Sequence, residues 1–248
     1  MQNQKTGAAG TGSGGAPVDK TALRNAATVI ALRRRDGQRE VLMGQRGARA
    51  AFMPGKFVFP GGAVDPGDAA VPLAAPLPPL CAERLAEDCA PGLAPALAAA
   101  AIRELWEETG LVLGRPGAWD GAPADWQSFA ATGHVPDASA LRFVFRAVTP
   151  PGRPRRFDAR FFTLDANRAI AGDLDDFAAA SDELSYLQWI PLPEARAFDL
   201  PFITEVVLAE VAARDSDEAP LNVPYFAQGE EAQLFRRLKG RSPLDGVS

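Results

Sequence analysis

Three glutamates fall close together in the run Arg103-Glu104-Leu105-Trp106-Glu107-Glu108-Thr109-Gly110-Leu111. The alanines and leucines around them favour a helix, and Gly110 is suited to end it in a left-handed conformation. On such a helix Glu104, Glu107 and Glu108 stand at i, i+3 and i+4 and share one face. Each i,i+4 pair of like charges costs roughly 0.2–0.5 kcal/mol. A hard divalent cation removes that repulsion, because Mg²⁺ prefers carboxylate oxygens and leaves water positions open for a phosphate substrate.

Taken alone, an ExxEE run is more often a solvated acidic helix face than a metal site. A second motif lies upstream, in Phe57-Val58-Phe59-Pro60-Gly61-Gly62-Ala63-Val64-Asp65-Pro66-Gly67-Asp68. The pairing of FPGG with REUxEExGU, where U is apolar, resembles the Nudix hydrolase superfamily. The motif of that superfamily reads G, five residues, E, seven residues and then REUxEExGU. The resemblance covers about residues 25–240 of this chain.

The chain departs from the superfamily motif in two ways. Asp68 stands six residues after Gly62, where the superfamily has a glutamate. The arginine that should follow at position 76 is found at 103, so 27 residues interrupt the motif. The interruption, about 69–95, is rich in Pro, Ala and Leu. Together with the flanking runs at 45–55 and 155–162, it resembles the branch that hydrolyses coenzyme A and its thioesters, known from peroxisomes.

The resemblance implies roles for the residues that match the motif. Glu104, Glu107 and Glu108 would hold Mg²⁺ or Mn²⁺, and the backbone at Gly62 would contribute to the metal site. Arg103 would orient a glutamate by a charge-assisted hydrogen bond. In many of these enzymes a later acid, just before a strand, supplies another metal contact or the general base. Glu183 fits by position, and the alternative is an exposed loop acid.

The most basic part of the chain is 33–49. It is either the charged, solvent-exposed edge of a hairpin or a binding site for substrate phosphates. Arg46 is favoured for phosphate binding because it lies where a strand leaves toward the motif, and Arg49 follows it. In the resembled branch the sequence Arg-Phe-Asp-x-x-Phe-Phe is associated with substrate binding. This adds Arg156 and Arg160 as candidates, with solvent-facing strand residues as the alternative.

The implied reaction is hydrolysis of a phosphoanhydride in a nucleoside diphosphate linked to another group. In the resembled branch the substrate is coenzyme A or acyl-coenzyme A, and the products are 3′,5′-ADP and (acyl-)4′-phosphopantetheine. One alternative is a Nudix pyrophosphatase acting on ADP-ribose, dinucleotides or nucleotide sugars. Another is a non-catalytic Nudix domain that binds a nucleotide. The complete set of Arg103 and three glutamates argues against a pure binding module, which has no need of crowded carboxylates.

The composition excludes several classes of protein. A net charge of −5 argues against a nucleic-acid or anionic-membrane binder driven by bulk charge. Only two cysteines occur, Cys81 and Cys89, so no disulfide framework is implied. No apolar stretch approaches membrane-spanning length, and residues 1–20 lack the apolar run of a signal peptide. We expect a cytoplasmic enzyme with a small nucleotide substrate. The resemblance also implies a possible homodimer, because members of the superfamily often dimerise.

The sequence predicts an α/β fold, a Nudix-type α/β/α sandwich with a mixed central sheet and an insertion inside the motif. Residues 1–20 read as a flexible tail, and 21–248 as a single domain with the insertion at about 69–95. Alternating apolar residues and the Asp36-Gly37 turn predict strands, and longer periodic runs predict helices. The expected strands are 25–35, 39–46, 57–59, 141–148, 157–164 and 185–191; the expected helices are 80–88, 96–111, 193–198, 201–214 and 230–239.

Overall fold

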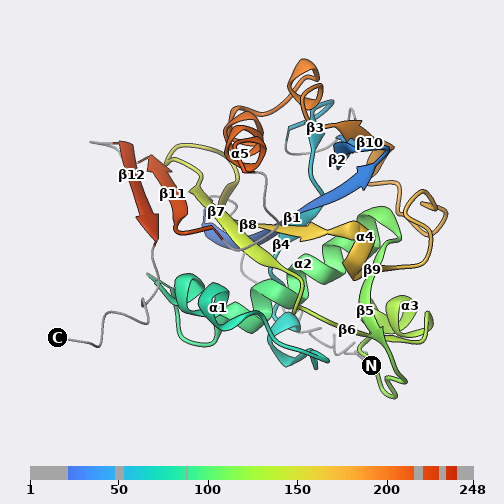
Figure 1. Cartoon of the computed structure of the whole chain (residues 1–248). Coiled ribbons are helices and arrows are strands. Elements are labelled where there is room, and N and C mark those ends of the chain that lie inside the picture. Colours follow the sequence, from blue (N-terminus) through green and yellow to red (C-terminus); the bar gives the residue numbers. More distant parts are fainter. Residues whose placement is uncertain (1–21, 48–52, 88, 215–219, 229–232, 239–248) are drawn as a thin grey trace, which may run out of the picture.

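The computed structural model describes residues 22–47, 53–87, 89–214, 220–228 and 233–238 (Figure 1). The predicted tail at 1–20 lies outside these ranges, and the prediction of one domain over 21–248 stays a prediction. The main helices are α1 (Pro79–Ala86), α2 (Leu93–Thr109), α3 (Gln127–Ala130), α4 (Ala166–Ala169) and α5 (Phe202–Ala212). The strands are β1 (Leu23–Arg35), β2 (Gln38–Arg46), β3 (Phe57–Val58), β4 (Gly61–Ala63), β5 (Val112–Pro116), β6 (His134–Pro136), β7 (Arg142–Val148), β8 (Arg156–Asp165), β9 (Ile170–Ala171), β10 (Leu184–Pro191), β11 (Val223–Gln228) and β12 (Gln233–Leu238).

One large sheet organises the chain, with strand order β10-β2-β1-β8-β7-β11-β12. β3 joins it beside β2, and β4 joins it beside β1. β1 runs parallel to β8, and β7 runs parallel to β11, while the other pairs in this sheet are antiparallel. The sheet is therefore mixed, as predicted. A smaller sheet of β6, β5 and β9 lies beyond the end of α2, and the sequence patterns did not predict it.

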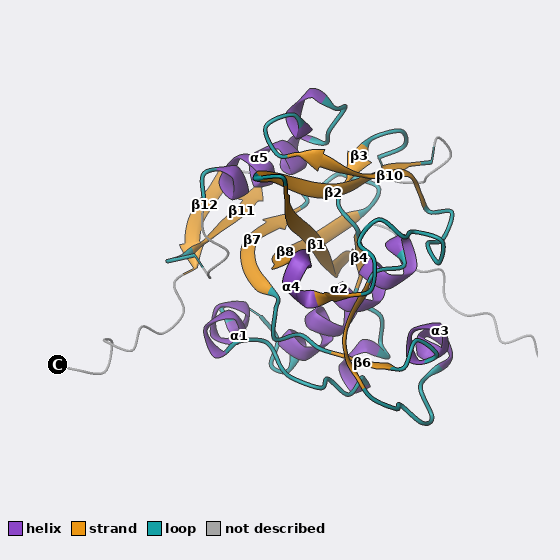
Figure 2. Ribbon diagram, turned by 45° about the vertical axis from the view of Figure 1, so that its right-hand side comes forward, coloured by secondary structure: helices purple, strands orange, loops and turns teal. Residues whose placement is uncertain are grey.

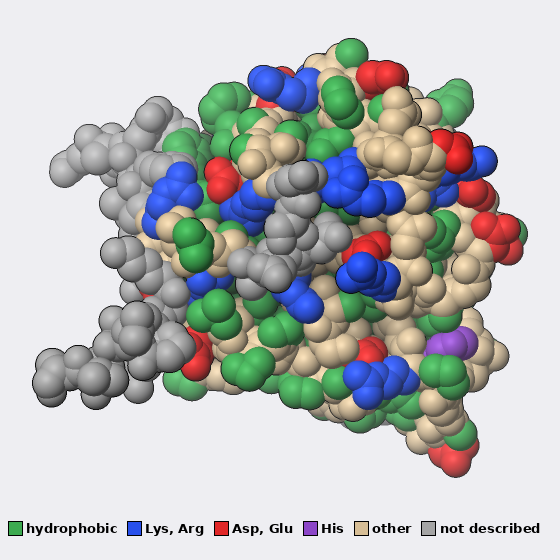
Figure 3. Space-filling model, in the orientation of Figure 1, with side chains coloured by type: hydrophobic (Ala, Val, Ile, Leu, Met, Phe, Trp, Pro, Cys, Tyr) green, Lys and Arg blue, Asp and Glu red, His purple; other side chains and the backbone are tan. Residues whose placement is uncertain are grey.

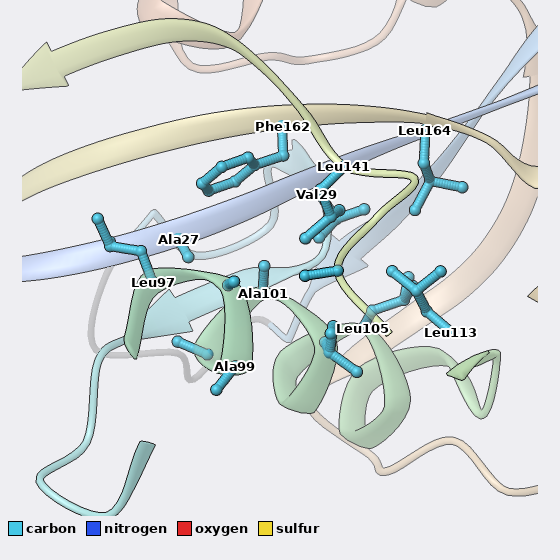
Figure 4. Packing of buried hydrophobic residues seen from close by; sticks show 14 of the residues in the cluster. Ala27, Val29, Leu97, Ala99, Ala101, Leu105, Leu113, Leu141, Phe162 and Leu164 are labelled. Carbon is cyan, nitrogen blue, oxygen red and sulfur yellow. The ribbon is translucent and has the colours of Figure 1, made fainter. Parts of the chain in front are cut away.

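Helices cover both faces of the large sheet, with α2 and α1 on one side and α5 on the other (Figures 1 and 2). Successive side chains of a strand point to opposite faces, and β1 follows this alternation. Its residues Ala27 and Val29 pack on the α2 side (Figure 4). Ile30 packs on the α5 side, with Val207 of that helix in the same cluster. This arrangement confirms the predicted α/β/α sandwich.

Small side chains let α2 lie close to the sheet. The consecutive alanines at 98–101 are all fully buried, and of those labelled in Figure 4 Ala101 points toward the sheet while Ala99 points to the opposite side of the helix. Leu97 and Leu105 flank them in the same core cluster (Figure 4). Gly110, with φ 74°, ends the helix, and its amide donates to the Trp106 carbonyl at 2.7 Å. The helix thus stops directly after its acidic residues, as the sequence predicted.

The insertion is built into the core and is not a surface excursion. Its helix α1, close to the predicted 80–88, contacts both α2 and β7. The side chains of Leu77, Cys81 and Leu85 are buried in the cluster that also holds α2. Another part of the insertion bonds beside β6, where the Ala74 amide donates to the Pro136 carbonyl at 2.7 Å and the Ala138 amide donates to the Ala75 carbonyl at 3.0 Å.

The expected helix at 230–239 is wrong where the structure describes it. Residues 233–238 form β12, which pairs antiparallel with β11 from Val223↔Leu238 to Gln228↔Gln233. β11 in turn pairs with β7, so this hairpin extends the edge of the sheet. Sheet pairing supplies backbone hydrogen bonds that local helix propensity cannot anticipate. Residues 193–198 form only a short 3₁₀ turn, at Ala195–Ala197.

None of the helices in the described ranges is both long enough and apolar enough to cross a membrane.

Candidate active site

The two halves of the motif meet where the last turns of α2 lie against β4. The Gly61 amide donates to Glu108 Oε2 at 2.7 Å. A Cβ placed on Gly62 would lie 2.4 Å from Glu104 Oε1. The backbone at Gly62 can therefore approach the carboxylate only because glycine has no side chain.

Arg103 is buried and holds the acidic cluster together. It donates at 2.8 Å to Glu104 Oε1 and at 3.2 Å to Glu107 Oε2. It also donates to the Ala63 carbonyl at 3.0 Å, which fixes it to β4. Burial disfavours the charged guanidinium, but hydrogen bonds to Asp68 and the nearby carboxylates outweigh burial and raise the pKa of Arg103. The arginine thus stays charged and neutralises part of the cluster.

Asp68 is the least exposed acid that contacts Arg103. Both carboxylate oxygens accept from the guanidinium at 3.1 Å, and Oδ2 also accepts from the Asp65 amide at 2.8 Å. Asp65, whose own side chain is exposed, forms a further ion pair with Arg103 at 3.5 Å that the motif does not predict. The shorter acid at position 68 therefore makes a full bidentate contact, the geometry that best suits arginine and a carboxylate.

The three glutamates share raised pKa values. Burial raises the pKa of Glu104 to about 7, with Glu107 and Glu183 adding to it and Arg103 opposing it. Burial also raises the pKa of Glu107. The pKa of Glu108 lies well above its ordinary value because the side chain is only 1% exposed and because Glu104 and Glu183 add negative charge. Closely spaced, desolvated carboxylates of this kind are typical of functional sites.

The donor set fits a hard divalent cation. Glu108 Oε1 is buried and has no hydrogen-bond partner in the described part of the chain. A buried carboxylate oxygen without a partner is costly, and a bound cation would satisfy it. Among the described residues, no three His, Cys, Asp or Glu side chains are already grouped as a metal site. Arg103 engages one oxygen each of Glu104 and Glu107, so the cluster is arranged around the arginine.

A loop brings Glu183 to the same end of α2. The Ser181 amide donates to the Glu107 carbonyl at 2.8 Å, and β10 begins just after Glu183. Glu183 Oε1 accepts from Arg46 at 3.0 Å, and Leu184 pairs with Arg46 across the sheet. The Arg46 Nε is buried and has no partner within the described ranges. The structure therefore places Arg46 and Glu183 together beside the acidic helix.

Comparisons with known proteins agree with this geometry. No family model matches the chain. The crystal structure of a NUDIX hydrolase from Alicyclobacillus acidocaldarius is 30% identical, with a TM-score of 0.60, and the match covers 78% of this chain and 93% of that one. The chain belongs to the Nudix hydrolase family. A curated Caenorhabditis elegans protein, "Putative nudix hydrolase 7", is 28% identical over 175 residues, which are 61% of this chain. The chain spans about half, 46%, of the length of that relative.

Not every predicted substrate-binding residue of this Nudix chain reaches the acidic cluster. Arg49 lies outside the described residues. Arg156, at the start of β8, donates to the Thr149 carbonyl at 3.3 Å and has no described contact with the glutamates.

Arg160 does not fit the prediction of a residue that binds substrate phosphate. Its side chain is 1% exposed, because β8 lies inside the sheet between β1 and β7. Its terminal nitrogens donate to Asn25 Oδ1 and the Asp158 carbonyl, each at 2.7 Å, and to Cys89 Sγ at 2.8 Å. These bonds tie the strand to β1 and to the insertion. The Arg160 side chain is therefore enclosed by protein atoms, and a role in substrate binding stays a prediction for Arg156 and Arg160.

Proposed function

We propose that this protein is a metal-dependent Nudix diphosphatase that cleaves coenzyme A or acyl-coenzyme A to 3′,5′-ADP and (acyl-)4′-phosphopantetheine. The observation that carries the hydrolase part is the buried, unpartnered Glu108 Oε1 inside the cluster held by Arg103, as seen among the described residues. The interrupted motif and its flanking runs support the coenzyme A branch.

Glu104, Glu107 and Glu108 would hold Mg²⁺ or Mn²⁺ together with the backbone at Gly62. When bound, such an ion neutralises a pyrophosphate and makes a coordinated water more acidic. Arg103 holds one oxygen each of Glu104 and Glu107 and counters their mutual repulsion. Because these contacts favour charge that develops in the transition state, losing one should lower kcat more than it weakens substrate binding.

Glu183 and Glu108 are the two candidates for accepting the proton of the attacking water. Glu108 already accepts from the Gly61 amide through one oxygen, and its other oxygen is the one that fits a cation. Glu183 is exposed, and its described contacts are with Arg46 and its own loop. We therefore favour Glu183 as the general base.

Arg46 is our candidate for the diphosphate. Its Nε, which has no partner among the described residues, and its bond to Glu183 place an always-charged, forked donor beside the acidic cluster. A substrate phosphate would bind the Arg46 guanidinium near the carboxylates.

A second substrate class is supported by the position of Arg160. The 3′-phosphate of coenzyme A needs cationic partners, and Arg160 is buried with its terminal nitrogens already bonded. A nucleotide without a 3′-phosphate, such as ADP-ribose, a dinucleotide or a nucleotide sugar, needs no such partner.

Nucleic acid is not our proposed substrate. The net charge is −5, and phosphate backbones are bound mainly by continuous basic surfaces. On the face drawn in Figure 3, Lys and Arg side chains are interspersed with acidic and apolar ones.

The deciding experiment is mass spectrometry of the products formed from coenzyme A, acetyl-coenzyme A, ADP-ribose, NADH and a nucleotide sugar, each incubated separately with Mg²⁺ or Mn²⁺. Release of 3′,5′-ADP from coenzyme A, faster than release of AMP from the others, is the expected result. AMP from the others with coenzyme A untouched would select the second class. Turnover that persists in both Glu107→Gln and Glu108→Gln would overturn the metal-site assignment.

A further inference from the structure

Strand β10 is interrupted by a bulge directly after the site loop. Its pairing with β2 is regular at Ser185↔Gln45 and resumes at Gln188↔Met43, with a register shift between them. Tyr186, inside the bulge, has φ 51° and is 74% exposed. Bulges are common next to active sites, where they redirect a side chain.

Gly44 of β2 makes room for this bulge. A Cβ on Gly44 would lie 2.9 Å from both Leu184 Cβ and Leu187 Cδ2. Leu184 is buried, and together with Leu187 it covers Gly44. The local sequence of two strands therefore supports a conformation that leaves the tyrosine ring outside.

The backbone of Tyr186 is strained, and its exposed ring gains no burial energy that would offset this strain. Positive φ is rare for a bulky non-glycine residue, and such conformations cluster at binding and catalytic sites. Tyr186 and Phe202 are the exposed aromatic residues among those the structure describes. Phe202 has no comparable backbone conformation, because it begins helix α5.

The bulge lies beside the proposed diphosphate site. Glu183 precedes Tyr186 by three residues, and Leu184 pairs with Arg46. Two residues of strand span about 7 Å, so the ring emerges within reach of a nucleotide whose phosphates lie at Arg46.

We propose that Tyr186 is the stacking platform for the aromatic base of the substrate nucleotide. This inference rests on the proposed function and adds a specificity residue to it. A tyrosine ring offers a rigid π-face that stacks on a purine at little cost in side-chain entropy. A substrate without a base would gain nothing from it.

The test is calorimetric binding of AMP, 3′,5′-ADP and inorganic pyrophosphate to the full chain and to three variants. Tyr186→Ala should weaken binding of both nucleotides about 5- to 100-fold and leave pyrophosphate binding unchanged. Tyr186→Phe should bind all three ligands like the parent chain. Phe202→Ala, which removes the other exposed ring, is the matched control and should also change nothing.

Equal effects of Tyr186→Ala on nucleotides and pyrophosphate, or no effect on either, would overturn the proposal, as would a parent chain that binds no nucleotide. Because binding is measured without turnover, an inactive parent chain that loses nucleotide binding only in Tyr186→Ala would reject the proposed hydrolysis and keep the stacking role. Tyr186→Gly relieves the positive φ and should raise Tm; a lower Tm would indicate a structural role for the ring.

Discussion

Asp68 and Arg103 join the two halves of the interrupted motif through a buried, bidentate ion pair, with both bonds at 3.1 Å. The interrupted motif is therefore continuous in space although it is broken in sequence. The entropy cost of closing a loop grows only slowly with its length, so an insertion of this size is compatible with an intact motif. The ion pair holds the arginine in place, and the arginine in turn holds the glutamates.

Replacing Asp68 should affect both stability and activity. Asp68→Asn removes the charge opposite a buried guanidinium, and leaving a buried charge without its partner typically costs about 3–5 kcal/mol. We expect a clear fall in Tm and a loss of kcat, measured by thermal unfolding and steady-state hydrolysis. Asp65→Asn is the control: the Asp65 side chain is exposed and lies 3.5 Å from Arg103, so its loss should shift stability by less than about 1 kcal/mol. Equal effects of the two variants would contradict this account.

Glu108→Gln should separate stability from activity. The amide oxygen of the new side chain can still accept from the Gly61 amide, while the buried negative charge disappears. In metal-free buffer we expect an unchanged or higher Tm, and with metal a loss of turnover of at least about 100-fold. Thermal unfolding in a chelator and product assays with Mg²⁺ measure the two quantities. A destabilised but active variant would show that Glu108 has a purely structural role.

Stability without metal should fall as the pH rises from about 5 to above 7. The pKa of Glu104 is raised from 4.5 to about 7, so between these values the folded chain binds more protons than the unfolded chain. Since stability falls with pH wherever the folded state holds the extra proton, the free energy of unfolding declines across this window. Unfolding by denaturant at several pH values checks the sign. Added Mg²⁺ should reduce the decline, because the ion takes the place of the proton; an unchanged slope would argue against metal binding here.

Gly62→Ala should damage the site with little change elsewhere. The new Cβ would meet the Glu104 carboxylate at 2.4 Å, and the side chain or β4 must move. We expect at least about a tenfold loss of kcat, because sub-ångström positioning of catalytic groups governs rate. Gly67→Ala is the matched control, since a Cβ there meets nothing within 4 Å and its φ of −74° suits alanine. Retained activity in Gly62→Ala would mean that Glu104 does not need its present position.

The sequence predicted the parts of the fold that depend on local pattern. The first strand with its basic end, the Asp36-Gly37 turn and the alanine-rich helix ending at Gly110 all have local causes and appear as expected. The hairpin of β11 and β12 depends on pairing with β7, which no local signal contains.

The same distinction applies to the site. The spacing of Glu104 and Glu108 placed them on one helix face, and both contact or approach the glycines of β4. The burial of Arg160 could not be read from an alternating strand, because both faces of this sheet are covered. The loop contact from Ser181 to Glu107 joins residues far apart in sequence through backbone atoms alone. The types of these residues therefore could not have predicted it.

The alanine layer of α2 has a consequence for how this protein can change over evolutionary time. Its residue Ala101 is fully buried and points toward the sheet, so its methyl group helps set the distance between helix and sheet (Figure 4). A larger side chain at Ala101 would push the helix outward and carry its glutamates away from the Gly61 amide. Mutations in this layer should therefore lower activity without replacing a catalytic residue. Substitutions here should be as rarely tolerated as substitutions of the acidic residues themselves.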